Sequence, residues 1–164
     1  MTKRYKSKKL APVDGLVVVF VCLFLLAVLP PACRKSRTDD MRITCARNLS
    51  ELGKAMLVYA NDYDGELPRA GGRNSMWSGR IMNWLADNRF AAYGASSDGS
   101  GGIATITSSL YLLVKYAGVA PKSFVCPGDT GTTEFNPADD GAGDRELAYL
   151  WDFGLESSKH CSYS

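Results

Sequence analysis

Residues 1–33, MTKRYKSKKLAPVDGLVVVFVCLFLLAVLPPAC, join a basic tail to an apolar segment. The apolar part, residues 13–29, would measure roughly 26 Å as a helix, against a bilayer hydrocarbon core of about 30 Å. Cations before an apolar helix keep the N-terminus in the cytoplasm. The order therefore predicts a cytoplasmic tail (residues 1–12), a single transmembrane helix (13–32) and an exported periplasmic or extracellular domain (33–164). The cations of the tail are Lys3, Arg4, Lys6, Lys8 and Lys9.

Three interpretations of the apolar segment stay open: a signal-anchor that remains in the membrane, a cleaved secretory signal, and the N-terminal helix of a pilin-like protein. The ending Ala32-Cys33 also has the small-residue-then-cysteine form of a bacterial lipoprotein signal. Prolines at the two positions before Ala32 fit that form poorly.

The charge of the chain is unevenly placed. The net charge is +2 from 19 Lys/Arg and 17 Asp/Glu, but residues 34–164 hold 14 of these cations and 16 of these acids. The exported part is therefore slightly acidic, and the basic character belongs to the tail. A nucleic-acid-binding domain needs a basic patch on its folded part, so no nucleic-acid partner is predicted.

Cysteine usage favours a disulfide in the exported part, where such bonds persist. Cys45, Cys126 and Cys161 are the candidates. Cys45–Cys126 is the favoured bridge and Cys126–Cys161 the alternative, because spacing alone does not decide. His160 is the only histidine and no Cys-x-x-Cys occurs, so no metal site is predicted, although His160, Cys161 and Cys126 together are a conceivable zinc set.

Residues 34–63 predict a helix with one apolar stripe, which indicates packing on a core. Gly65 is suited to end this helix in the left-handed conformation, with Pro68 just beyond. The stripe consists of Cys45, Leu49, Leu52, Met56, Tyr59 and Tyr63.

Shorter elements follow. Residues 69–75 are a loop rich in Gly and Arg, and residues 110–117 predict a helix capped by Ser108-Ser109. Residues 123–126 predict a short strand, and residues 149–154 a strand or an aromatic core segment.

Six acids interleaved with glycines lie between residues 129 and 146 and predict a solvated loop. A bound Ca²⁺ is the alternative, with Asp139, Asp140 and Asp144 as candidate ligands, although no fixed ligand spacing supports it. No cofactor is predicted, with calcium kept only as this alternative.

Three motifs together resemble a known family. They are the apolar helix ending in Leu-Pro-Pro-Ala, the run CARNLSELG at residues 45–53 with YANDYDGELP at residues 59–68, and FVCPGD at residues 124–129. This combination is similar to the type II secretion pseudopilin-like proteins of planctomycete-type bacteria, which carry a prepilin-type N-terminal helix. The similarity runs without gaps from Leu10 to Pro68 and returns near Cys126.

The resemblance implies a pilin-like α+β fold, in which a long N-terminal helix, half transmembrane and half amphipathic, packs on a small antiparallel sheet. It also implies a bacterial inner-membrane location. In the family a Gly precedes the cleavage point, followed by Phe and, four residues later, a Glu used in assembly. The matching positions are Lys9, Leu10 and Asp14, which make a degenerate processing site and an assembly carboxylate. Family members continue beyond the equivalent of Ser164, so a domain truncated at its C-terminus is one expectation.

The first function hypothesis is a non-enzymatic, membrane-anchored structural subunit of a type II secretion or pilus-like assembly. Its partners would be the lipid bilayer and copies of itself or other pilin-like subunits. The alternative is a monomeric, membrane-anchored binding module for a glycan, calcium or protein, with Trp77, Trp84 and Trp151 as a stacking surface. An enzyme built on His160 and Cys161 is the third hypothesis, but sequence neighbours rarely face one another productively, so no catalytic residue is assigned.

Overall fold

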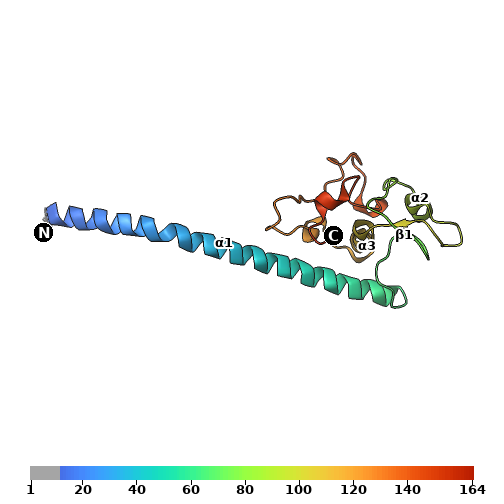
Figure 1. The fold of residues 1–164 in the computed structure, drawn as a ribbon, viewed down its shortest axis with the longest axis horizontal. Coiled ribbons are helices and arrows are strands. Elements are labelled where there is room, and N and C mark those ends of the chain that lie inside the picture. Colours follow the sequence, from blue (N-terminus) through green and yellow to red (C-terminus); the bar gives the residue numbers. More distant parts are fainter. Residues whose placement is uncertain (1–11) are drawn as a thin grey trace, which may run out of the picture. The chain divides into compact units, whose positions relative to one another are not determined.

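The structure is a computed structural model that describes residues 12–164, with side chains described outside residues 12–14 and 26–36. Its elements are α1 (Pro12–Asp62), β1 (Met76–Trp77), α2 (Arg89–Tyr93), β2 (Ile103–Ala104), α3 (Ile106–Ala117) and the 3₁₀ turns η1 (Pro121–Phe124), η2 (Leu147–Tyr149) and η3 (Ser157–His160) (Figure 1). The chain divides into two compact units, Met1–Asp40 and Met41–Ser164, which we describe separately.

The described side chains of the first unit include an apolar run on α1 whose members are all solvent-exposed. Leu16 is 71% exposed, Phe20 69% and Phe24 63%. No helix in the described part of the chain combines the length and the apolar character that crossing a membrane requires. The prediction of a transmembrane half in the N-terminal helix is therefore wrong on this finding.

The second unit has its core around α3. Tyr111, Leu112 and Leu113 are almost fully buried, and the ring of Phe153 lies 4.8 Å from that of Tyr111 and 4.9 Å from that of Phe124, between ring centroids. Thr105 caps the helix, because its side chain accepts from the Ser108 amide while the Ser108 hydroxyl accepts from the Thr105 amide. The helix thus begins at Ile106, four residues before the predicted start at residue 110.

The part of α1 that belongs to the second unit packs on this core through one stripe. Leu52 and Tyr59 are buried and Met56 is half-buried, as predicted. Leu49 is 51% exposed and Tyr63 39%, so these two members of the predicted stripe are not buried. Gly65 ends the segment with φ +84°, and its amide donates to the Ala60 carbonyl, which is the left-handed termination expected from the sequence.

A disulfide ties this part of α1 to the segment after η1. It joins Cys45 to Cys126, the bridge that the sequence favoured, across 81 positions of the chain. Next to it, Asn48 Nδ2 donates to the Val125 carbonyl at 3.0 Å, and Ser123 Oγ donates to Glu51 Oε2 at 3.1 Å. Cys161 is a buried free thiol, so the alternative bridge is not formed.

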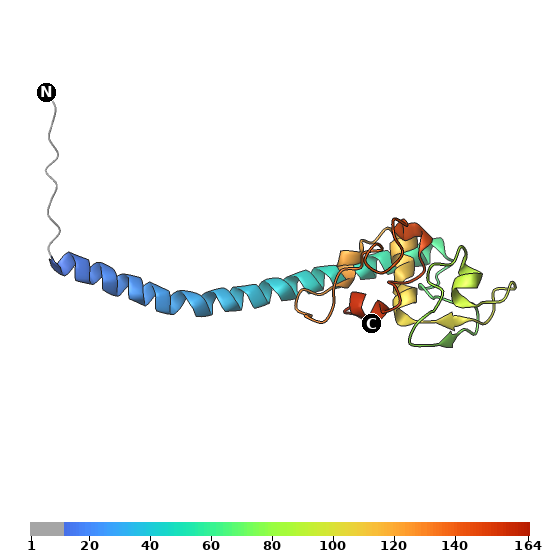
Figure 2. The ribbon, with the colours of Figure 1, turned by 90° about the horizontal axis from the view of Figure 1, so that it is seen from above.

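The predicted small antiparallel sheet is wrong. The described residues contain one two-stranded sheet, in which β1 and β2 run parallel with Met76 opposite Ile103 (Figure 2). Gly71 lies five residues before β1 and Gly102 directly before β2, both at positive φ, a conformation outside the β region, so neither strand extends further towards the N-terminus past these glycines. The segment predicted as a strand at residues 123–126 instead overlaps the second half of η1, a 3₁₀ turn that Pro121 opens.

Candidate functional site

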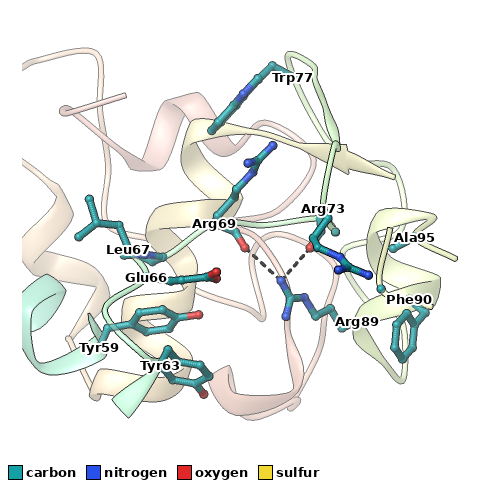
Figure 3. A pocket seen from close by; sticks show the side chains of 14 residues that line it. Tyr59, Tyr63, Glu66, Leu67, Arg69, Arg73, Trp77, Arg89, Phe90 and Ala95 are labelled. Atoms are coloured by element: carbon teal, nitrogen blue, oxygen red, sulfur yellow. Dashed lines mark hydrogen bonds between the residues drawn. The ribbon is translucent and has the colours of Figure 1, made fainter. Parts of the chain in front are cut away.

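A pocket of about 800 Å³ lies between the end of α1, the loop of residues 66–73 and α2. We call it the arginine pocket, because three arginines line it together with aromatic side chains. Figure 3 shows Trp77 at one end of the view, Tyr59 and Tyr63 at the other, and the arginines between them. Its lining consists of Tyr59, Tyr63, Glu66, Leu67, Pro68, Arg69, Gly71, Gly72, Arg73, Trp77, Arg89, Phe90, Ala95 and Gly99.

Two glycine-rich segments form the wall that carries Arg73. The Gly72 amide donates to the Gly101 carbonyl at 3.0 Å, the Arg73 amide to the Gly99 carbonyl at 2.8 Å, and the Gly101 amide to the Arg73 carbonyl at 2.7 Å. A Cβ at Gly72 would lie 2.5 Å from the Gly99 carbonyl oxygen, so only glycine allows this close approach. The result is a closely bonded wall rather than a free loop.

Arg89 is fixed by backbone carbonyls on the facing loop. One of its terminal nitrogens, Nη2, donates to the Gly71 carbonyl at 2.7 Å and to the Arg69 carbonyl at 3.2 Å (Figure 3). The residue stands at the start of α2, whose N-cap Asn88 accepts from the Ala91 amide. The short helix therefore positions a guanidinium whose other nitrogens remain available to a ligand.

Hydrogen bonds to a hydroxyl and to a carbonyl hold the other two arginines. Arg69 Nη2 donates to Ser75 Oγ at 3.3 Å, and its side chain extends in the direction of Trp77 (Figure 3). Arg73 Nη2 donates to the Asp98 carbonyl at 3.5 Å. The ion pairs found among the described residues are Lys159–Glu156 and His160–Asp140, so none involves an arginine of the pocket.

The aromatic end of the pocket comes from the last turns of α1. The rings of Tyr59 and Tyr63 stack with centroids 4.2 Å apart and planes at 11°. Burial raises the pKa of Tyr59, so its hydroxyl stays protonated at neutral pH. Glu66, which follows on the same segment, is the one carboxylate among the lining residues.

A second polar cluster lies inside the core, where the chain enters α3. Asp152 is fully buried, and its carboxylate accepts from Thr105 Oγ1 at 3.3 Å, from Thr107 Oγ1 at 3.2 Å and from the Phe153 amide at 2.8 Å. Burial outweighs these hydrogen bonds and raises the pKa of Asp152 to about 7. Because the group has no access to solvent, we assign it to the hydrogen bonding of the core and not to ligand binding.

The calcium candidates do not converge on one point. Asp139 accepts from Asn136 Nδ2 at 2.8 Å, and Asp140 lies 3.3 Å from His160 Nε2. Asp144 is exposed. In the part of the chain that the structure describes, no cluster of three or more His, Cys, Asp or Glu side chains could hold a metal ion.

His160 and Cys161, which the enzyme hypothesis combines, have separate surroundings. His160 Nδ1 lies 3.0 Å from the Thr133 carbonyl, so both ring nitrogens already have polar neighbours. Cys161 is 3% exposed, and burial raises the pKa of its thiol, which lowers the fraction of thiolate.

The remaining sequence-based candidates are dispersed. Trp84 and Trp151 are buried, whereas Trp77 is 61% exposed, so the three tryptophans do not form one stacking surface. Lys9 and Leu10 lie outside the described residues. Asp14 lies in α1, and its side chain is outside the described part.

Sequence reasoning missed the pocket, although it noted a loop rich in Gly and Arg at residues 69–75. Arg89 lies 20 positions after Arg69, and only the folded chain shows that they share a cavity. The signal that could have pointed to it is the pair of arginines beside consecutive glycines, a composition typical of a tightly bent, polar loop. Scans against protein-family models, curated proteins and solved structures found no match to this chain.

Proposed function

We propose that the protein is a non-enzymatic structural subunit that assembles with copies of itself through the N-terminal part of α1, in the manner of the pseudopilin-like proteins it resembles. The observation that carries the proposal is the exposed apolar run between residues 16 and 25. Its described members are at least 48% exposed. They are Leu16, Val17, Val18, Val19, Phe20, Val21, Leu23, Phe24 and Leu25.

The distribution of these side chains supports a multi-helix assembly. Nine large apolar residues within ten positions cover every face of the helix and not one stripe. A helix that is apolar all round is normally buried on all sides, and a single partner groove would cover only one face. Copies of the same helix offer the same length and the same all-round surface, so we take the occupant to be a second and further copy of this chain.

The energetic gain from such packing is large. Burying one Val, Leu or Phe side chain fully contributes about 1.5–3 kcal/mol. The free energy gained by even partial burial of the run therefore exceeds the conformational entropy lost when a few side chains become ordered. Such surface left in water would be an aggregation hazard, which supports a dedicated interface.

The disulfide lies in the second unit, next to the segment of α1 that follows the apolar run. Residues 45–51 of α1 are joined to the η1 region by the Cys45–Cys126 bond and by the side chains of Asn48 and Glu51. These contacts hold residues 45–51 of the helix on the core of the second unit.

The test compares Phe20→Asp with Met82→Asp in the full chain, in aqueous buffer without detergent. Phe20 is 69% exposed in the apolar run and Met82 is 67% exposed in the second unit, so the two changes are matched in exposure. We expect wild type and Met82→Asp to sediment as concentration-dependent oligomers and Phe20→Asp as a monomer. Wild type that stays monomeric at every concentration would contradict the proposal and leave the monomeric binding module as the better hypothesis.

A further inference from the structure

We propose that the arginine pocket binds an acidic saccharide, that is, a short sugar chain bearing carboxylate groups. This site is separate from the apolar run of α1, since all of its lining residues lie between Tyr59 and Gly99. The proposal therefore stands independently of the assembly function.

The charge of the pocket selects an anion. Three guanidinium groups and one carboxylate, that of Glu66, line it. The guanidinium hydrogen bonds described for the pocket go to a hydroxyl and to backbone carbonyls, and neither ion pair found among the described residues involves them, although Arg73 also attracts the nearby Asp98 carboxylate. A guanidinium presents a planar fork of donors that matches a carboxylate with two parallel hydrogen bonds, and this match is the main attraction we assign.

The aromatic side chains select a sugar over a small inorganic anion. Trp77, Tyr63 and Phe90 are 61%, 39% and 47% exposed, so part of each ring is open to a ligand. Pyranose rings have an apolar face of C–H groups that packs on the negative face of an aromatic ring. A volume of about 800 Å³ is in the range of cavities that enclose ligands of several rings.

Polar groups suited to sugar hydroxyls complete the site. Glu66 accepts hydrogen bonds from hydroxyls, and the Tyr59 hydroxyl, which burial keeps protonated, donates them. The glycine wall and the carbonyl clamp on Arg89 hold the site before a ligand arrives, which lowers the ordering cost of binding.

The experiment is calorimetric titration of the full-length protein with trigalacturonate, using neutral maltotriose and triglutamate as comparison ligands. We expect trigalacturonate to bind, and to bind less tightly as salt rises because screening weakens the ion pairs. Maltotriose lacks the carboxylates and triglutamate lacks the sugar rings, so each should bind about tenfold more weakly or not at all.

Three variants locate the binding site. Arg69→Gln and Trp77→Ala should each weaken trigalacturonate binding about tenfold. Arg80→Gln is the matched control, because Arg80 is an exposed arginine outside the pocket lining, and its affinity should stay within about twofold. Circular dichroism of each variant checks the fold, and Arg73→Gln replaces Arg69→Gln if the latter is unfolded.

Three results would overturn the proposal. The first is no binding of trigalacturonate to the wild-type chain. The second is triglutamate or maltotriose binding as tightly as trigalacturonate, which would indicate an acidic peptide or a neutral sugar instead. The third is an equal loss of affinity in Arg80→Gln and in the pocket variants. Binding should be the same in the Phe20→Asp variant, so a failed assembly proposal and a failed saccharide proposal remain distinguishable.

Discussion

The same residue types have opposite fates in the two units of the chain. Phe20 and Leu16 in the first unit are 69% and 71% exposed, whereas Phe153 and Leu113 in the second are fully buried. Spacing explains the difference: the first unit has apolar residues at consecutive positions from 16 to 25, whereas the second interleaves them with polar residues and glycines. Consecutive apolar residues cannot bury themselves on one helix, so under the proposed function other copies of the chain bury them, whereas the second unit buries its own apolar residues.

The disulfide gives the largest expected difference between the units. Replacing both Cys45 and Cys126 with Ser should lower the free energy of unfolding of the second unit by about 4.5 kcal/mol, because the bond closes a long loop in the unfolded chain. Urea unfolding followed by tryptophan fluorescence measures this, since Trp84 and Trp151 are buried.

Cys22→Ser is the matched control for that loss. Cys22 is an exposed free thiol in α1, so its replacement should leave the unfolding of the second unit unchanged. A similar loss in both proteins would show that the Cys45–Cys126 bond is not what stabilises the second unit.

The next largest effect separates two phenylalanines. Phe153→Ala should destabilise the second unit by about 4 kcal/mol, because it leaves a cavity beside Tyr111 and Phe124. Phe24→Ala, at a position 63% exposed, should leave unfolding of the second unit unchanged and weaken oligomerisation instead. If both variants lower the free energy of urea unfolding by the same amount, the difference between the two regions is contradicted.

A buried carboxyl gives the second unit a dependence on pH. The folded pKa of Asp152, about 7, lies above the unfolded value near 3.9, so the folded state binds more protons between these values. The stability that the protonated Asp152 carboxyl contributes is therefore fully present below about pH 4 and is lost as the pH rises through 7.

Asp152→Asn should remove this dependence. The variant should match wild type at pH 4 and exceed its free energy of unfolding at pH 8 by on the order of 3 kcal/mol. Other acids, such as Asp98 and Asp129, have a lowered pKa and therefore change stability with pH in the opposite direction. Their contributions cancel when the free energy of unfolding of wild type is subtracted from that of the variant. A difference that is constant from pH 4 to pH 8 would contradict the burial effect.

The smallest expected effect concerns the support of Arg89. Asn88→Ala removes the N-cap of α2 and should cost about 1 kcal/mol, whereas Asn88→Asp keeps an acceptor for the Ala91 amide and should cost little. Urea unfolding of the two variants checks the difference. If both behave alike, the cap does not stabilise the wall of the arginine pocket.

Local features of the fold were predictable from the sequence. The stripe from Cys45 to Tyr63 predicted the helix, Gly65 its end, and the expected export of the chain a disulfide for which Cys45–Cys126 was favoured. Each depends on helical spacing, on the conformational freedom of glycine, or on the redox environment of the chain.

Long-range features were not predictable. The parallel pairing of β1 and β2 depends on hydrogen bonds between segments about 27 positions apart, and glycine composition alone gives no register. The arginine pocket depends on carbonyls of Arg69 and Gly71 that hold Arg89, and backbone acceptors leave no pattern in the sequence. The transmembrane helix was predicted from the basic tail and the apolar run, and the antiparallel sheet from the family resemblance; the structure supports neither.

The most direct test of the difference between the units is the labelling rate of Cys22 with a maleimide as a function of protein concentration. The labelled protein carries Cys33→Ser, so that Cys33 does not react with the maleimide. The remaining cysteines are protected, since Cys161 is buried and Cys45 and Cys126 are bonded to each other. If the apolar run is an interface between copies, labelling of Cys22 should slow at least tenfold at concentrations where the protein oligomerises, and the Phe20→Asp change should restore the fast rate. A rate that is fast and identical at every concentration would contradict the claim that other copies bury this part of α1.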